Sequence, residues 1–295
     1  MFKNTLLRTA AALAVLISAS TAANAAQPLA LEVYNPGLNS MFPVSSELIT
    51  GKTDAVLIDA QFQHNDAQAL VEKIRASGKK LTTIYISHSD PDYYFGLDVL
   101  QAAFPDAKIV ATAPTVAAIK ASMNGKLAYW GPILKANAPH SLVLPAVLDG
   151  NSITLEGHKL EVVGLDGPSP ARTFVWIPSL KAVVGGVVVF GNMHLWIADT
   201  QTTAERRDWL ATLDRIAALK PATVVPGHYL NGAPQTLASV EFSRDYLLSF
   251  ETAAAKAGTS GELIAAVKQQ YPNLGGEVDL EMSAKVVKGD MKWPQ

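Results

Sequence analysis

The first half of the chain alternates between segments with a helical hydrophobic pattern and segments with a strand-like one. Residues 65–80 carry apolar side chains at helical spacing, with polar residues at the start and Gly78 near the end. A shorter helix is predicted at 94–107, and another begins at Pro114, which suits a first helical turn. The remaining segments are alternating or fully apolar over strand length, and they lie at 31–36, 45–60, 81–87 and from Lys108 onward.

The second half of the chain repeats this order. Its predicted strands are 158–165, 172–180, 181–190 and 221–229. Its predicted helices are 202–220, capped by Thr202 or Thr203, and then 235–258 and 260–272. Two strand-rich halves, each with its own helices, predict an α/β (α+β) protein built as an αββα sandwich of two mixed sheets with helices on both outer faces. The strand-end loops of both halves should then meet along one edge of the sandwich.

The composition is that of an ordinary globular protein with a small-molecule partner. The 295 residues are 49% hydrophobic and 17% charged, enough to form a full core, and the net charge of -2 gives no reason to expect nucleic acid or a membrane as partner. The absence of cysteine excludes disulfides, thiolate metal ligands and a cysteine nucleophile. No nucleotide-binding loop or serine-nucleophile motif occurs. The oligomeric state is not indicated.

The N-terminal residues 1–25 have the pattern of a cleavable signal peptide. Lys3 and Arg8 precede an apolar run at 10–17, and Ala23-Asn24-Ala25 fits a small-x-small cleavage site. We therefore expect cleavage near Ala25 and export, most simply to a bacterial periplasm. The mature chain, 26–295, is expected to form a single domain with a C-terminal helical extension. The pattern of that extension leaves open whether it covers a cleft or forms a dimer contact.

A chemically distinctive loop follows the predicted strand in the segment TTIYISHSDPDYYFGLDVL, residues 82–100. His88, Asp90 and Asp92 occupy alternate positions there. Imidazole and carboxylate are both zinc ligands, and a catalytic zinc site needs about three protein ligands and an open water position. The same residues also have structural interpretations, which stay open: Asp90 as a turn former, Asp92 as a helix N-cap, and His88 as a hydrogen-bonded core residue.

Five segments in order resemble the metallo-β-lactamase-fold hydrolase superfamily. They are AVLIDA (55–60), IYISHSDPDYYFG (84–96), PSPARTFVWIP (168–178), KAVVGGVVVF (181–190) and VVPGHY (224–229). The resemblance extends over roughly residues 30 to 250. It implies an αββα sandwich with one or two zinc ions at the sheet edge, bound by a loop of the form H-x-H-x-D-H and by later residues.

Transferred residue by residue, the resemblance describes a divergent member of this superfamily. His88 matches the first histidine of the loop, Asp92 its aspartate, and His228 the last histidine of the family. The other family ligands are replaced here by Asp90, Tyr93, Pro168 and Val187.

The resemblance implies an exported metal-dependent hydrolase of an ester, lactone or amide bond, β-lactams included. We expect one ion rather than two, Zn²⁺ first, with Mn²⁺ or Fe²⁺ suited to an oxygen-rich set. The predicted ligands are His88, Asp90, Asp92, His228 and Asp166. In catalysis, Asp92 or Asp90 would orient the water and Tyr93 would stabilise the oxyanion. The alternative is a metal-free or non-catalytic periplasmic protein that binds a small molecule on the same fold.

Two further histidines carry no signal of their own in the sequence. His64 stands where a loop passes into the predicted helix 65–80, and its polarity is explained by that position. His140 lies in a polar joint between predicted elements. The sequence assigns neither residue a ligand role.

Overall fold

The computed structural model describes residues 28–293, so the predicted signal segment lies outside the described residues. Within them, the first sheet has six strands in the order of the chain. Its first three strands are antiparallel neighbours and the remaining ones run parallel, so the sheet is mixed. The strands are β1 (Ala30–Tyr34), β2 (Ser46–Thr50), β3 (Asp54–Ile58), β4 (Lys80–Ile86), β5 (Lys108–Ala111) and β6 (Ala146–Val147).

The second sheet has the strand order β12-β10-β9-β8-β7. Only the β10–β12 pair is parallel, so this sheet is mixed as well. A small parallel pair, β11 with β13, continues beside it. The strands are β7 (Ser152–Leu155), β8 (His158–Val163), β9 (Phe174–Ile177), β10 (Ala182–Val184), β11 (Phe190–Gly191), β12 (Thr223–Val224) and β13 (His228–Tyr229).

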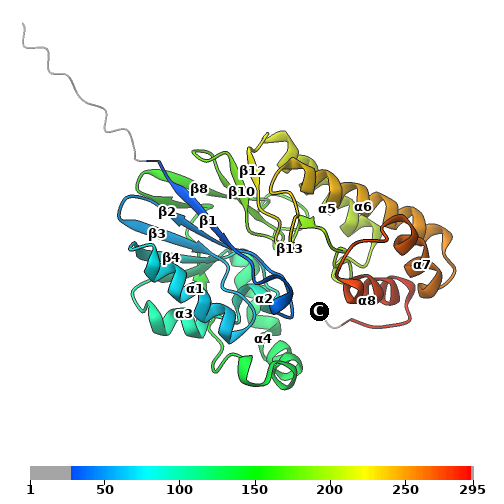
Figure 1. Cartoon of the computed structure of the whole chain (residues 1–295), viewed down its shortest axis with the longest axis horizontal. Coiled ribbons are helices and arrows are strands. Elements are labelled where there is room, and N and C mark those ends of the chain that lie inside the picture. Colours follow the sequence, from blue (N-terminus) through cyan, green and yellow to red (C-terminus); the bar gives the residue numbers. More distant parts are fainter. Residues whose placement is uncertain (1–27, 294–295) are drawn as a thin grey trace, which may run out of the picture.

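Helices accompany each sheet on its own side, as Figure 1 shows: α1, α3 and α4 lie beside the first sheet and α5 and α6 beside the second, with α7 and α8 next to α6. No helix in the described part of the chain is long and apolar enough to cross a membrane. The helices are α1 (His64–Ala76), α2 (Pro91–Tyr94), α3 (Leu97–Ala103), α4 (Ala113–Leu134), α5 (Thr203–Ala218), α6 (Leu237–Lys256), α7 (Ser260–Gln270) and α8 (Glu277–Lys288), with short 3-10 turns η1 (Gly37–Asn39) and η2 (Lys135–Asn137).

The apolar interior has two parts, as a sandwich requires. One cluster joins inward side chains of both sheets, among them Val56, Tyr85, Ile177 and Val184, all essentially unexposed. The larger cluster joins the sheets to the helices outside them. Each fully buried aliphatic side chain contributes about 1.5–3 kcal/mol relative to an exposed one. The predicted αββα sandwich of two mixed sheets is confirmed.

The predicted strand 181–190 is interrupted, and two glycines account for this. Strand β10 ends at Val184, where Gly185 and Gly186 take φ values of 67° and 82°. A Cβ on Gly186 would lie 2.2 Å from the carbonyl oxygen of Thr173. Only glycine tolerates both this backbone conformation and this approach. The chain therefore leaves the sheet here and pairs again only at β11.

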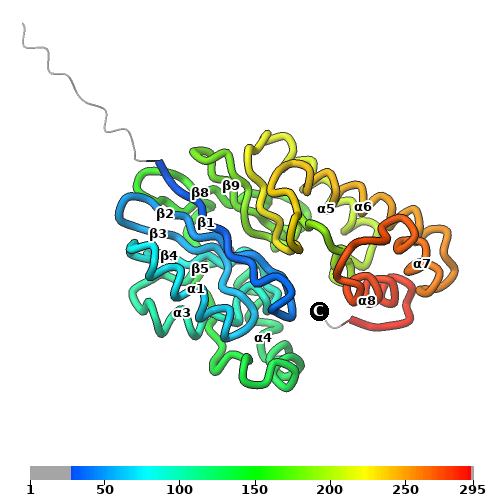
Figure 2. The backbone as a smooth tube through the Cα atoms, in the orientation of Figure 1, coloured from blue at the N-terminus to red at the C-terminus, as the bar shows by residue number. Residues whose placement is uncertain are grey.

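The C-terminal segment returns to the middle of the molecule. It forms helix α8, whose bounds were not predicted from the sequence, and Gly275 before this helix pairs with Met193 beyond β11. Figure 2 follows the red tube from α7 through α8 and back toward α4. Trp293 there contacts Tyr129 of α4 with ring centroids 6.4 Å apart.

Candidate functional site

The loop between β4 and α2 is held at the sheet edge by a buried hydrogen-bond chain. The Asp59 carboxylate, at the end of β3, accepts bonds from the Ser87 backbone N–H at 2.7 Å and its hydroxyl at 2.6 Å. The Ser87 hydroxyl in turn accepts a bond from the Gly186 N–H at 2.8 Å. Because β3 and β4 belong to the first sheet and Gly186 follows β10 of the second, this chain joins the two sheets beside His88.

His88 and Asp90 form one side of the candidate site together with Lys126 of α4. The His88 Nδ1 atom lies 3.3 Å from an Asp90 carboxylate oxygen and accepts the Asp90 backbone N–H at 3.2 Å. Lys126 donates to the other Asp90 oxygen at 3.1 Å and to the Ser89 carbonyl at 2.8 Å. Burial alone would raise the pKa of Asp90, but His88 and the Lys126 ammonium lower it well below its usual range. Asp90 is therefore an ionised carboxylate, already paired.

These contacts define the structural role of the Asp90 side chain in the β4–α2 loop. Asp90 is the N-cap residue of α2, but its side chain makes no capping hydrogen bond. Its carboxylate bonds to side chains and not to the backbone, so the turn-former interpretation is not what the structure shows.

Asp92 and His228 form the other side of the site. The His228 Nε2 atom lies 3.1 Å from an Asp92 carboxylate oxygen, and both side chains are more than nine-tenths buried. The His228 ring stacks on Phe190, with centroids 5.3 Å apart, because β11 and β13 pair at these two residues. Burial opposes the charge of His228, but the hydrogen bond to Asp92 outweighs it, and the pKa of His228 is raised. The Gly227 before it is required, since a Cβ would lie 2.1 Å from the Gly186 carbonyl oxygen.

The Tyr93 ring stands between the two pairs. Its centroid lies 5.5 Å from that of His88 and 5.7 Å from that of His228, edge-on to both. Its hydroxyl is fully buried and faces the Gly186 carbonyl at 3.5 Å. Burial, and then the carboxylate of Asp92, keep the pKa of Tyr93 well above its usual value. The phenol is buried and points at the backbone, so this geometry gives no support to the predicted oxyanion role of Tyr93.

Buried carboxyl groups surround this cluster. Burial, with a smaller contribution from the nearby Asp92 carboxylate, raises the pKa of Asp59 to about 7 and that of Asp279 to about 7. Burial raises the pKa of Asp199 to about 6, with Asp90 adding to the effect. Acidic groups this close disfavour each other's ionised forms. A cation at this cluster would favour the ionised forms of these carboxyl groups.

Three members of this cluster were not found from the sequence: Lys126, Asp199 and Asp279. Lys126 is 36 residues from Asp90 along the chain. Asp199 accepts hydrogen bonds from the indoles of Trp196 and Trp293, and Asp279 comes from α8 in the C-terminal extension. No local spacing relates these residues to the β4–α2 loop, so only tertiary packing could reveal them.

Asp166 is located elsewhere. Its carboxylate is 72% exposed and forms a two-bond ion pair with Arg215 of α5, at 2.8 Å for each contact. Arg215 lowers the pKa of Asp166 to about 2. No hydrogen bond or ion pair between the described residues links Asp166 to the other four predicted ligands. Its predicted ligand role is therefore not supported. Asp166 lies at the surface, where it forms an ion pair with Arg215 of α5.

The donor set offers a metal ion two ligand atoms on the Asp92 side, one fewer than a usual catalytic zinc site has, and its carboxylate on the His88 side is already paired. Ligand atoms of one tetrahedral zinc, at bonds of about 2.0–2.1 Å, lie about 3.3 Å apart, close to the Asp92–His228 separation of 3.1 Å. Asp92 and His228 would hold such an ion, with Asp279 as the nearby buried carboxyl group. On the other side, Lys126 already supplies the positive charge at Asp90. Between Pro28 and Trp293, no three ligand atoms of this set lie within 4.8 Å of one another.

Comparisons with known proteins agree with this fold. Residues 40–228 match the family profile of the metallo-β-lactamase superfamily. A solved metallo-β-lactamase from Pontibacter korlensis is similar at 19% identity with a TM-score of 0.53, covering 75% of this chain and 95% of that one. A crystal structure of DIM-1 metallo-β-lactamase exposed to ceftazidime has 20% identity and a TM-score of 0.49, covering 77% and 94%. No curated protein matches. Because the matched residues make up more than half of the sequence, the chain belongs to the metallo-β-lactamase superfamily.

Proposed function

We propose that this protein hydrolyses an ester, lactone or amide bond of a small molecule at the edge formed by His88, Asp90, Asp92 and His228. The observation that carries the proposal is the buried Asp92–His228 contact of 3.1 Å, with the buried carboxyl groups of Asp59 and Asp279 nearby. Membership of a superfamily made up mostly of metal-dependent hydrolases supports it. A divalent ion held by Asp92 and His228 would supply a Lewis acid and an acidified water.

The chain's own groups have distinct roles in this proposal. Asp92 accepts the hydrogen bond of His228 and fixes the orientation of its ring. Lys126, 21% exposed, carries the positive charge that can attract a carbonyl oxygen or a substrate carboxylate. Asp90 holds Lys126 in place and, with its lowered pKa, is a poor general base. Tyr93 separates the two imidazoles and keeps both oriented.

Two parts of the proposal rest on the sequence alone. The predicted signal segment 1–25 supports export to a periplasm, and mass spectrometry of the native protein should find a chain that starts near Ala26. The ordinary net charge supports a small-molecule partner and gives no support to nucleic acid or membrane.

The test combines metal content and hydrolysis. Purified mature protein, 26–295, is loaded with Zn²⁺, Mn²⁺ or Fe²⁺ and assayed with an aryl ester, a lactone, an amide and a β-lactam. Asp92→Asn keeps the shape and removes the charge, and it should lower the rate at least about 10²-fold and reduce bound metal. Asp106→Asn, the same change in an exposed turn, is the matched control and should change neither. Hydrolysis unaffected by Asp92→Asn would contradict the proposal.

One observation favours a second candidate function, non-catalytic binding of a small molecule. The two carboxylates of the loop are already paired, Asp90 with Lys126 and Asp92 with His228. The negative charge of these two carboxylates is therefore partly neutralised without a metal ion. No hydrolysis in any substrate class, together with ligand-dependent thermal stabilisation that survives chelation, would support this function.

A further inference from the structure

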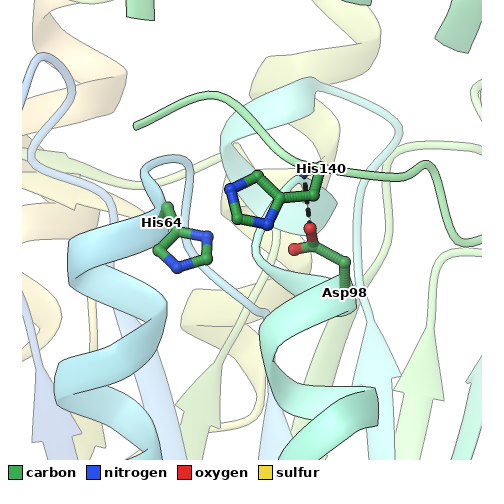
Figure 3. A group of neighbouring side chains, drawn as sticks. All are labelled: His64, Asp98 and His140. Atoms are coloured by element: carbon green, nitrogen blue, oxygen red, sulfur yellow. Dashed lines mark hydrogen bonds between the residues drawn. The ribbon is translucent and has the colours of Figure 1, made fainter. Parts of the chain in front are cut away.

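A second group of potential metal ligands lies on the first-sheet side of the molecule. His64 begins α1, Asp98 lies in the first turn of α3, and His140 belongs to the segment between η2 and β6. One ligand atom of each lies within 4.8 Å of the others. Figure 3 shows a ring nitrogen of each imidazole and the Asp98 carboxylate turned toward the same space. This group shares no residue with the cluster around Tyr93.

His64 offers a nitrogen with no other function in the fold. Its Nδ1 atom is buried and has no hydrogen-bond partner among the described residues. Its other nitrogen, Nε2, lies 3.1 Å from the side-chain amide of Gln68, one helical turn later. The Gln68 atom at this contact is the amide nitrogen, which donates to Nε2 in this orientation. A flip of the amide brings its oxygen to Nε2, so that Nε2 carries the proton and Nδ1 presents its lone pair to an ion. Metal-bound histidines are commonly oriented in this way through the second ring nitrogen.

Asp98 is oriented by backbone donors and retains free acceptor capacity. One carboxylate oxygen accepts the Val99 N–H at 2.8 Å, and the other accepts the His140 N–H at 2.7 Å and the Ser141 N–H at 3.4 Å. Each carboxylate oxygen has two lone pairs, so the oxygen bonded to Val99 keeps one for a cation. The same bonds fix the His140 backbone beside Asp98, as the dashed line in Figure 3 shows.

His140 completes the group from the solvent side. It is exposed, and its ring lies against that of His64 with centroids 4.7 Å apart and an interplanar angle of 33°. The group borders a surface hollow of about 730 Å³ whose lining also includes Gln68, Glu72 and Arg75. Arg75 is paired with Glu72, so the described residues that line this hollow include no unpaired cation to compensate Asp98. An ion would reach the group directly from solvent.

We propose that His64, Asp98 and His140 form a binding site for one divalent transition-metal ion of the zinc type. Two imidazoles and one carboxylate, with an open position toward solvent, are a three-ligand set that Zn²⁺ accepts. The ligand atoms of one such ion lie about 3.3 Å apart, so small side-chain rotations suffice to close the present spacing. Two imidazoles disfavour Mg²⁺ and Ca²⁺, which prefer oxygen ligands. The ion would tie α1, α3 and the segment before β6 together.

The test is isothermal titration calorimetry, in which Zn²⁺ is added to tag-free mature protein that carries Asp92→Asn and His228→Ala. These substitutions remove the ion of the proposed function, so the two proposals are tested separately. We expect one equivalent of Zn²⁺ to bind and no binding of Mg²⁺. His140→Ala removes an exposed ligand, keeps the backbone bond to Asp98, and should raise the Kd at least about tenfold, as losses around metal sites do. His158→Ala, which removes a histidine outside the group, should leave the Kd unchanged.

A spectroscopic readout distinguishes ligation from an indirect effect. With Cu²⁺ as the probe, electron paramagnetic resonance should show coupling to two nitrogens, and to one in His140→Ala. The zinc content can also be compared without the Asp92→Asn and His228→Ala substitutions. In that case His140→Ala should bind one equivalent of zinc fewer than the wild type. Absence of a zinc equivalent in the background protein, a loss of affinity below tenfold, or an equal loss in His158→Ala would overturn the proposal.

Discussion

At the scale of single residues, the site edge is defined by ionisable groups that the fold keeps from water. Glu47 is the extreme case: it lies in β2 opposite Ile58, is fully buried, and neither carboxylate oxygen has a hydrogen-bond partner among the described residues. Burial, with nearby Asp59, raises the pKa of Glu47 to about 8, although Ser45 and the Gly185 backbone favour the ionised form. Glu47 is therefore mostly protonated at neutral pH.

This raised pKa makes stability depend on pH in a defined direction. The folded-state pKa is about 8 against an ordinary value of 4.5, so the contribution to stability is complete below pH 4.5 and is lost as pH rises through 8. Glu47→Gln keeps the shape and cannot ionise. Its free energy of unfolding should exceed that of the wild type increasingly from pH 5 to 8, by at most about 1.4 kcal/mol per pH unit.

Urea unfolding at intervals between pH 5 and 9 measures this difference. Exposed Glu241→Gln is the matched control and should show no such trend. A constant difference between Glu47→Gln and the wild type over this range would mean that Glu47 is ionised throughout.

At the scale of elements, the β4–α2 loop is fixed by contacts to α4. Asp90 and Lys126 are each about a fifth exposed, at 22% and 21%, and Lys126 also holds the Ser89 carbonyl. The pair thus joins a site loop to a helix of the same half of the fold. This is the interaction through which α4 contributes to the site.

Removing Asp90 should destabilise the protein whether or not a metal is present. Asp90→Ala leaves the Lys126 ammonium without its carboxylate, and we expect a loss of about 1–3 kcal/mol, less than for a fully buried pair. Lys126→Met should cost a similar amount, and the double variant should cost less than the sum. Chemical denaturation with and without chelator measures these losses.

The comparison with chelator tests the role of Asp90 directly. Lys120→Met, an exposed change on the same helix, is the control and should have little effect. If the loss in Asp90→Ala disappears when metal is chelated, then Asp90 acts as a metal ligand and the pairing with Lys126 is secondary.

At the scale of the whole molecule, the C-terminal segment closes the site edge. Trp293 donates a hydrogen bond to Asp199 at 2.7 Å and contacts Trp196 with centroids 5.1 Å apart. On its other side it contacts Tyr129 of α4. One indole therefore connects the α4 side of the molecule with the loop beyond β11, and α8 brings Asp279 near His228 on the way.

Removing the Trp293 indole should lower stability and increase backbone mobility in both segments that it contacts. Trp293→Ala removes two aromatic contacts and one hydrogen bond to a carboxyl group, for an expected loss of about 1–3 kcal/mol. Hydrogen exchange should quicken around residues 193–200 and in the last turns of α4. Trp293→Phe keeps an aromatic ring and loses only the hydrogen bond. Its stability should therefore lie between that of the wild type and that of Trp293→Ala. Unchanged exchange in both segments would contradict a bridging role.

Local sequence patterns determined most of the elements and the residues nearest the site loop. Helix α1, the capping box of α5 at Thr202, and strand β4 with His88 directly beyond it depend on neighbours along the chain, so spacing and capping chemistry were sufficient. The bounds of helix α8 and the break at Gly186 were not found, because the helix packs on distant elements and the break is required by the Thr173 backbone.

Tertiary structure alone decided how charge is distributed at the two candidate sites. Lys126, Asp199 and Asp279 reach the Tyr93 cluster from elements far apart in the chain, whereas Asp166 is paired at the surface with Arg215. The Asp98 carboxylate accepts the backbone N–H groups of His140 and Ser141, and these bonds fix the segment whose His140 ring contacts that of His64. Electrostatic interaction depends on distance and burial, and neither quantity is a function of spacing along the chain.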